Sequence, residues 1–234
     1  MKYETGTFAH ICARGTRRLP IVHDDQDRWH FLELLYYVNH TESRRNLFRQ
    51  LKELKEEQNT KAAFFWPPMW EPRTPIVNIV AYALVENHFH LLLEQRQENG
   101  IPRFMQKIGI GMAKYYNQKY KTSGNLFQGK YRAKIVDTDE YLMYVSVYIH
   151  VKNILEVYPG GMKAALRDVD KALRWAIEYP FGSLGDYAGS RNSSILEKSV
   201  LGRMFEESNS YRKFAKECLI GMNLEEKLGK LAVE

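Results

Sequence analysis

Two apolar runs separated by two residues place the strongest constraint on the fold of this chain. The runs IVNIVAYALV (76–85) and HFHLLLEQ (88–95) are rich in β-branched and aliphatic residues, and only Glu86 and Asn87 stand between them. Two strand-like segments joined by so short a polar link are typical of a β-hairpin. The chain is therefore expected to contain an antiparallel sheet built around this hairpin.

The segments on either side of the hairpin alternate between extended and helical patterns. Apolar spacing, acidic first turns and turn residues separate them. Strands are predicted over 7–16 and over 126–136, the latter with a break at Gly129, and helices over 24–40, 43–58, 101–120 and 137–153. This order predicts an α+β fold of the ferredoxin-like split βαβ type, an antiparallel sheet with helices on one side.

The pattern also divides the chain into a core and an extension. Residues 1–158 are expected to form the sheet domain, with the proline-containing segment 41–75 as an insertion. Residues 159–234 begin with glycine- and proline-rich turns and continue into amphipathic stretches, so they are expected to form a C-terminal helical appendage. The last part, 190–234, fits docking on the core, contact with DNA or contact between two copies, so a monomer and a homodimer both fit.

Composition restricts the class of protein and its compartment. Hydrophobic residues make up 44% and charged residues 26%, which is typical of a globular protein. The two cysteines, Cys12 and Cys218, are far apart, which excludes a disulfide framework and a zinc ribbon. The longest apolar run is shorter than the ~20 residues of a membrane span, and no signal peptide is recognisable at the start. A cytoplasmic protein without a membrane partner is expected.

Two histidines in the second run of the hairpin are the candidate metal ligands. Side chains alternate along a strand, so His88 and His90 project from one face while Phe89, Leu91 and Leu93 point into the core. Two imidazoles on one face can share a divalent ion, although an isolated HxH pair is often incidental. The zinc-protease motif HExxH is missing, so a peptide-hydrolysing zinc site is not supported.

A row of tyrosines follows one face of the predicted helix 137–153. Tyr141, Tyr144, Tyr148 and Lys152 are spaced at i, i+3, i+7 and i+11. Packing at the edge of an amphipathic helix accounts for such a row. A tyrosine beside a metal ion can instead act as a nucleophile and carry a covalent intermediate.

The positive charge of the chain is concentrated in one stretch. Lys and Arg total 34 against 28 Asp and Glu, a net charge of +6, yet residues 101–136 contain no acid at all. Their cations alternate with Phe and Tyr, which favours binding of single-stranded nucleic acid over a solvated helix face. The candidate nucleic-acid-binding residues are Arg14, Arg17, Arg18, Lys107, Lys114, Lys130, Arg132 and Lys134.

Taken together, these stretches resemble the single-tyrosine HUH transposases, and among them the REP-associated tyrosine transposases. The similar segments follow the family's order over most of 8–189. They are HICARGTRRLPIVHDDQDRWHFLELL, YALVENHFHLLLEQ, FMQKIGIGMAKYYNQKYKTSGNLFQGKYRAKIVDTDEYLMYVSVYIHVKN and YPFGSLGDYAG.

The resemblance implies a metal-dependent enzyme that cleaves and rejoins single-stranded, hairpin-forming DNA. His88 and His90 match the family's histidine pair, which holds Mg²⁺ or Mn²⁺ on the scissile phosphate. Tyr148 matches the nucleophile, which forms a 5′-phosphotyrosine link and releases a 3′-hydroxyl.

One position departs from the family's pattern. The family usually carries Asn or Gln four residues after the tyrosine as a third metal ligand, and that position is Lys152 here. Asn153, Glu86 or water could supply the missing ligand, whereas His150 is expected on the far side of the helix. Three functions therefore stay open: the strand transferase, a catalytically silent nucleic-acid-binding module on the same fold, and a small metal-dependent hydrolase.

Overall fold

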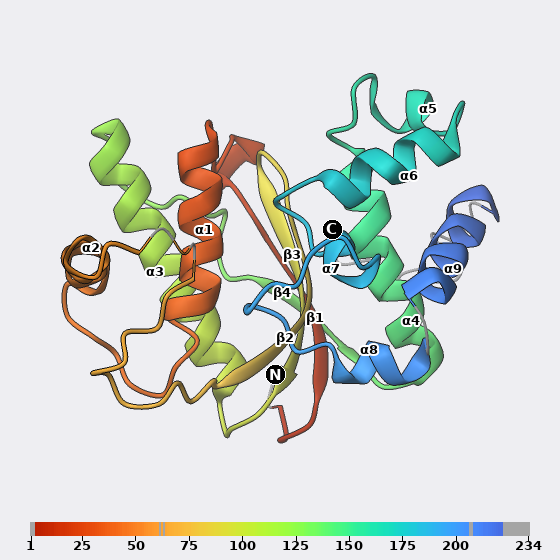
Figure 1. Cartoon of the computed structure of the whole chain (residues 1–234). Coiled ribbons are helices and arrows are strands. Elements are labelled where there is room, and N and C mark those ends of the chain that lie inside the picture. The colour runs from red at the N-terminus through yellow and green to blue at the C-terminus, as the bar shows by residue number, and fades with distance from the viewer. Residues whose placement is uncertain (1–2, 61, 63, 206–207, 222–234) are drawn as a thin grey trace.

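A four-stranded antiparallel sheet forms the centre of the protein (Figure 1). The computed structural model describes residues 3–60, 62, 64–205 and 208–221. The strands are β1 (Phe8–Arg14), β2 (Val77–Leu84), β3 (His88–Gln95) and β4 (Arg132–Val136), in the order β2-β3-β1-β4. This order is that of the ferredoxin-like plan, so the predicted α+β fold and the predicted hairpin are confirmed.

The register of the two central strands assigns each side chain to a face of the sheet. Cys12 of β1 lies opposite His90 of β3 and Arg132 of β4. Residues directly opposite each other in an antiparallel pair project from the same face. One face therefore carries the histidines and several cations, and the other carries the apolar residues between them.

Two helices cover the apolar face, as predicted. They are α1 (Asp25–Tyr37) and α3 (Gly100–Tyr120), on the left in Figure 1. Phe89, Leu91 and Leu93 of β3 are buried in the same hydrophobic cluster as residues of both helices. The insertion adds α2 (Leu47–Glu57), which lies on the outer side of α1 and α3.

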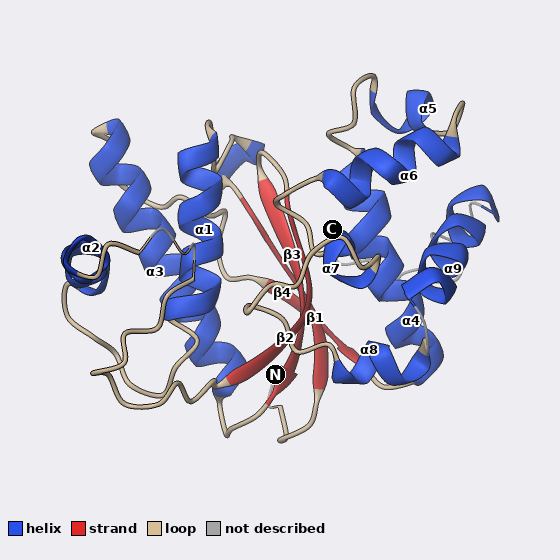
Figure 2. Cartoon of the chain, viewed as in Figure 1, coloured by secondary structure: helices blue, strands red, loops and turns tan. Residues whose placement is uncertain are grey.

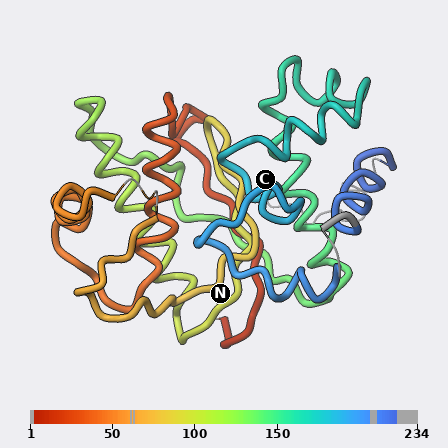
Figure 3. The backbone as a smooth tube through the Cα atoms, viewed as in Figure 1, coloured from red at the N-terminus to blue at the C-terminus, as the bar shows by residue number. Residues whose placement is uncertain are grey.

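The second group of helices covers the histidine face (Figure 2), so helices lie on both sides of the sheet and not on one side as predicted. After β4 the chain forms α4 (Asp139–Val147) and one π-helical turn, η2 (Tyr148–Asn153). The C-terminal helices pack around these two, and α9 lies beside α4 (Figure 3). They are α5 (Gly161–Ala165), α6 (Val169–Glu178), α7 (Leu184–Tyr187), α8 (Ser199–Met204) and α9 (Ser208–Gly221).

The C-terminal helices and the sheet domain share one hydrophobic cluster, which joins residues of β2 and α4 to residues of α6 and α9. The predicted boundary at 158 stays a prediction. The part of the predicted appendage after residue 221 lies outside the described residues. Within the described residues, no helix combines the length and the hydropathy that a membrane span requires.

Two elements differ from their prediction. The strand expected over 126–136 forms only over Arg132–Val136, and its earlier part makes a single bridge between Phe127 and Gly15. The break comes in the segment around Gly129, because glycine weakens a strand. The helix expected over 137–153 changes from α to π winding at Tyr148.

Candidate metal and nucleophile site

Four ring side chains meet on the histidine face of the sheet. The ring centroids of His88 and His90 are 5.0 Å apart, and those of His10 and His90 are 5.1 Å apart. Tyr148 lies with its ring 5.7 Å from that of His10 and 5.8 Å from that of His90. The structure thus brings together the histidine pair and the tyrosine that the sequence singled out.

The hydrogen bonds of Asn87 fix the tautomer of His88. The Asn87 amide donates to the Arg18 carbonyl at 3.2 Å, so its oxygen is the atom that lies 2.7 Å from His88 Nδ1. That oxygen can only accept, so Nδ1 carries the proton and the neutral ring keeps its lone pair on Nε2. His88 Nε2 is therefore the atom of this ring that can bind a metal ion.

His10, which the sequence analysis did not single out, plays the equivalent part for His90. Its Nε2 lies 2.8 Å from His90 Nδ1, and its side chain is buried. Burial lowers the pKa of His10 to about 3, and burial together with the neighbouring His10 lowers the pKa of His90 well below its ordinary value. Both rings are neutral at pH 7, so when His90 Nδ1 donates to His10, His90 keeps its lone pair on Nε2.

Asn153 is the predicted third ligand that carries a buried amide. Its side chain is 1% exposed, and neither its oxygen nor its nitrogen has a hydrogen-bond partner among the described residues. A buried amide without partners is rare and requires an explanation such as a bound ion. Glu86, another candidate from the sequence, is exposed.

A carboxylate missed by the sequence analysis also approaches the pair. Glu156 Oε2 lies 3.9 Å from His88 Nε2. Among the described residues, no three His, Cys, Asp or Glu side chains are grouped closely enough to hold a metal ion. A complete site would thus need an amide oxygen or water in addition to the imidazoles, and the orphaned amide of Asn153 fits this requirement.

The π-helical turn decides which side chains lie near Tyr148. In such a turn, residues five apart take the relation that residues four apart have in an α-helix. Asn153 therefore follows Tyr148 as the i+4 residue would in regular winding. Lys152 lies on the same side, with its Nζ 3.5 Å from the Tyr148 hydroxyl and 4.8 Å from the ring centroid.

His150 lies away from this site, as expected. Its Nε2 is 2.7 Å from the Ser183 hydroxyl, and its Nδ1 is in hydrogen-bond contact with the Tyr211 hydroxyl. The ring is fully buried, and burial lowers its pKa to about 3. His150 thus ties η2 to the C-terminal helices.

Cations of β1 and β4 flank the histidines on the same face. Arg14 lies opposite His88, and Lys134 lies opposite His10 in the register of the sheet. A groove of about 370 Å³ runs between the ends of β1 and β4. It is lined by Cys12, Arg14, Arg18, Gln128, Gly129, Lys130 and Arg132. Arg17 and Arg18 belong to the 3₁₀ turn η1 (Thr16–Arg18) that follows β1.

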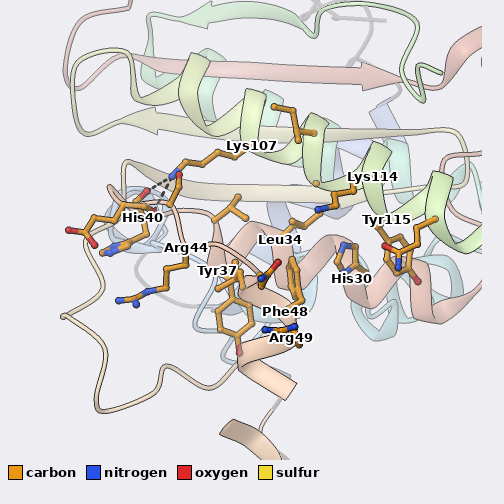
Figure 4. Close-up of a pocket in the computed structure, with 18 of the residues that line it drawn as sticks. His30, Leu34, Tyr37, His40, Arg44, Phe48, Arg49, Lys107, Lys114 and Tyr115 are labelled. Carbon is orange, nitrogen blue, oxygen red and sulfur yellow. Dashed lines mark hydrogen bonds between the residues drawn. The ribbon is translucent and has the colours of Figure 1, made fainter. Parts of the chain in front are cut away.

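Two of the predicted DNA-binding lysines lie elsewhere, on α3 at the apolar face. Lys107 donates to the carbonyl oxygens of His40 at 2.6 Å and Glu42 at 3.3 Å. Lys114 lines a cavity between α1, α3 and the insertion (Figure 4). The acid-free stretch is therefore divided between the two faces, because the helix and the strand within it pack on different sides.

Residues 73–152 match the sequence model of the family described as "Transposase IS200 like". Over this segment the chain is similar to the IS200-like transposases. The match confirms the resemblance seen in the sequence, and it contains the histidine pair and Tyr148. His10 lies before the part that is matched.

Two further comparisons were with solved structures and with curated proteins. A solved structure described as "Structure of the REP associates tyrosine transposase bound to a REP hairpin" is similar over 83% of this chain and 93% of that chain, with 10% sequence identity and a TM-score of 0.45. The search of curated proteins found no match.

Proposed function

We propose that this protein is a metal-dependent DNA transposase that cleaves and rejoins single-stranded, hairpin-forming DNA through a 5′-phosphotyrosine intermediate. The observation that carries the proposal is the approach of Tyr148 to the histidine pair, with its ring 5.8 Å from that of His90. The relation to a family of transposases supports the same class of reaction.

His88 and His90 would bind Mg²⁺ or Mn²⁺ through Nε2, and Asn153 would add its amide oxygen. Such an ion supplies Lewis-acid polarisation of the phosphoryl oxygens and favours the ionised form of a nearby phenol. His10 would keep His90 in the tautomer that binds metal, because its ring accepts the proton of His90 Nδ1.

Tyr148 would attack the scissile phosphorus through its hydroxyl oxygen. A bond forms between that oxygen and phosphorus, the bond to the 3′ oxygen breaks, and the 3′ oxygen takes up a proton. The phosphodiester energy is kept in the phosphotyrosine link, so the reverse reaction rejoins the strand. The ammonium of Lys152, 3.5 Å from the hydroxyl, would stabilise the phenolate.

The Tyr148 side chain is completely buried in this structure. A phosphate group can reach its oxygen only when the segments that cover it move. Arg14, Arg132 and Lys134 project from the same face of the sheet as the histidines, and they would bind phosphates of the incoming strand.

The test is incubation of the full chain with a labelled single-stranded DNA hairpin and Mn²⁺, followed by denaturing electrophoresis. We expect a labelled protein band that Tyr148→Phe abolishes. Tyr144→Phe is the matched control, since Tyr144 lies on the same helix and packs against Phe214 of α9 instead. A band of equal strength in Tyr148→Phe would overturn the assignment of the nucleophile.

A catalytically silent DNA-binding module is the second candidate. It is favoured by Lys152, a cation at the position where the family usually has an amide. Tight binding of the hairpin without any covalent band, in Mg²⁺ or Mn²⁺, would support it. Weak DNA binding with hydrolysis of small phosphoesters would instead support the small metal-dependent hydrolase. A cytoplasmic location also stays a prediction.

A further inference from the structure

A second cavity lies on the other side of the sheet from the histidines (Figure 4). It is enclosed by α1, α3 and the turn that leads into α2. Its volume is about 690 Å³, which is within the range of small-molecule binding sites. The insertion supplies one wall of this cavity, which we call the α2 pocket.

Aromatic rings form much of the wall of the α2 pocket. His30 of α1 and Tyr115 of α3 are stacked, with ring centroids 3.9 Å apart and planes 18° apart. Phe48 of α2 lies next to them, with its ring 4.6 Å from that of His30. The planes of Phe48 and His30 are 53° apart, so the three rings form an angled aromatic wall against which another ring can pack.

Cations stand on two sides of this aromatic wall. Lys107 and Lys114 come from α3, and Arg44 and Arg49 come from the insertion (Figure 4). Glu42 is the one acidic side chain among the described residues that line the pocket. Arg49 is also paired with Glu53 at 3.6 Å, and Arg44 lies over the Trp70 ring. The pocket is therefore positively charged, and it suits an anion that carries an aromatic ring.

We propose that the α2 pocket binds one unpaired nucleotide of the DNA strand, at a site separate from the histidines. The base would stack on the aromatic wall, and Lys114 and Arg44 would contact the phosphates on its two sides. The inference rests on the proposed function only in taking single-stranded DNA as the substrate. It also gives the α3 lysines a role in DNA binding that does not require them to lie near Tyr148.

The test measures binding without chemistry. All proteins carry Tyr148→Phe so that no covalent link forms, and fluorescence anisotropy reports the affinity for a DNA hairpin with a labelled single-stranded tail. Lys114→Ala should weaken binding about threefold to tenfold. It should also make the negative slope of log K against log salt shallower by about 0.7. Phe48→Leu should weaken binding about fivefold or more and leave the salt slope unchanged, because it removes a stacking ring and no charge.

Lys121→Ala is the matched control, since Lys121 is exposed at the end of α3 and does not line the pocket. It should bind like the background protein. Unchanged affinity and salt slope in both Lys114→Ala and Arg44→Ala would overturn the proposal. If Phe48→Leu does not fold, Lys114→Ala and Arg44→Ala still test the proposal.

Free dAMP separates the two possible sources of the nucleotide. Stabilisation by dAMP that is lost in Lys114→Ala, with DNA affinity unaffected, would make the α2 pocket a site for free nucleotides and overturn the DNA assignment. A failure of the proposed function would give a different result. The unmodified protein would then form no covalent band, while the DNA affinities measured here would be unchanged.

Discussion

The two faces of the sheet are built from opposite kinds of side chain. On β1, His10, Cys12 and Arg14 project to one face, while the alternating small and aliphatic residues project to the other. The α1 and α3 face is a packed apolar layer. The histidine face is also covered by helices, yet its buried interior contains imidazoles, hydroxyls and an amide.

This difference shows how a buried polar site can be stable. The polar groups of the histidine face mostly bind one another, as His10 binds His90 and His150 binds Ser183. Such bonds offset the cost of removing the groups from water. Asn153 departs from this pattern, which is why its amide stands out as a ligand.

Acidification gives the largest expected effect and tests the buried imidazoles of the histidine face. His150 has a pKa of about 3 in the folded protein against an ordinary value of 6.5. Between these values the unfolded chain binds the proton and the folded chain does not, so stability falls as the pH falls. At pH 4 this loss should be on the order of 3 kcal/mol for His150. Urea unfolding at pH 7 and pH 4 measures it. His150→Gln should remove about this amount of the loss, whereas the loss due to His10, His90 and His30, whose pKa values burial also lowers, should remain.

Asp27 of α1 provides the control on the opposite face. Burial raises its pKa, but hydrogen bonds from Lys119 and Tyr120 outweigh burial and hold the pKa below its ordinary value of 3.8. Its contribution to stability is therefore present above pH 4 and is lost only in stronger acid. Asp27→Asn should lower stability without changing its slope between pH 4 and pH 6.5. A loss of stability between pH 7 and pH 4 in His150→Gln as large as that of the unmodified protein would contradict the prediction.

Replacement of His10 tests whether the hydrogen bonds of the histidine face serve metal binding. His10→Leu removes the acceptor for His90 Nδ1 and should lower the affinity for Mn²⁺ about 10-fold to 100-fold. His10→Gln keeps an acceptor oxygen and should retain most of the affinity. Titration calorimetry on the full chain measures both, and ¹H–¹⁵N spectra of the metal-free protein report which nitrogen of His90 carries the proton.

A purely structural role of His10 would give a different outcome. Leu and Gln at position 10 would then impair Mn²⁺ binding equally, or neither would impair it. The tautomer of His90 would also be the same in both variants.

Two glycines of α3 give the smallest effect and test the packing of the apolar face. A methyl group added at Gly111 would lie 2.6 Å from Leu34 Cδ2, whereas nothing lies within 4 Å of one added at Gly109. Gly111→Ala should lower the free energy of unfolding by about 1 kcal/mol because the buried Leu34 must move. Gly109→Ala should raise it by about 0.5–1 kcal/mol through helix propensity. Equal effects in thermal unfolding would show that α3 is loosely packed on α1.

The sequence predicted the fold and the histidine face because both depend on local alternation. His88, Phe89 and His90 are assigned to faces by position alone. His10 follows the same rule, since it alternates with Ala9 and Ile11 in the first strand. Its partner His90 is 80 residues away, however, and only the pairing of β1 with β3 brings the two rings together.

Charge composition predicted less than strand alternation. It identified a basic stretch but does not show to which face of the sheet each side chain points. Lys107 and Lys134 were therefore grouped, although they lie on different sides of the sheet. The π-helical turn has no local signature either. It forms when backbone hydrogen bonds join residues five apart instead of four apart. The packing of η2 between the sheet and the C-terminal helices decides which of the two patterns forms.

The π-helical turn also shows how a protein can gain a residue without moving the parts on either side of it. Tyr148–Asn153 are wound as a π-helical turn, and the wider winding of such a turn can absorb one residue while the spatial spacing of the residues at its ends is kept. A position-by-position alignment of this helix with regularly wound relatives would pair Lys152 with their amide. An alignment guided by winding would open a gap of one residue and pair Asn153 instead.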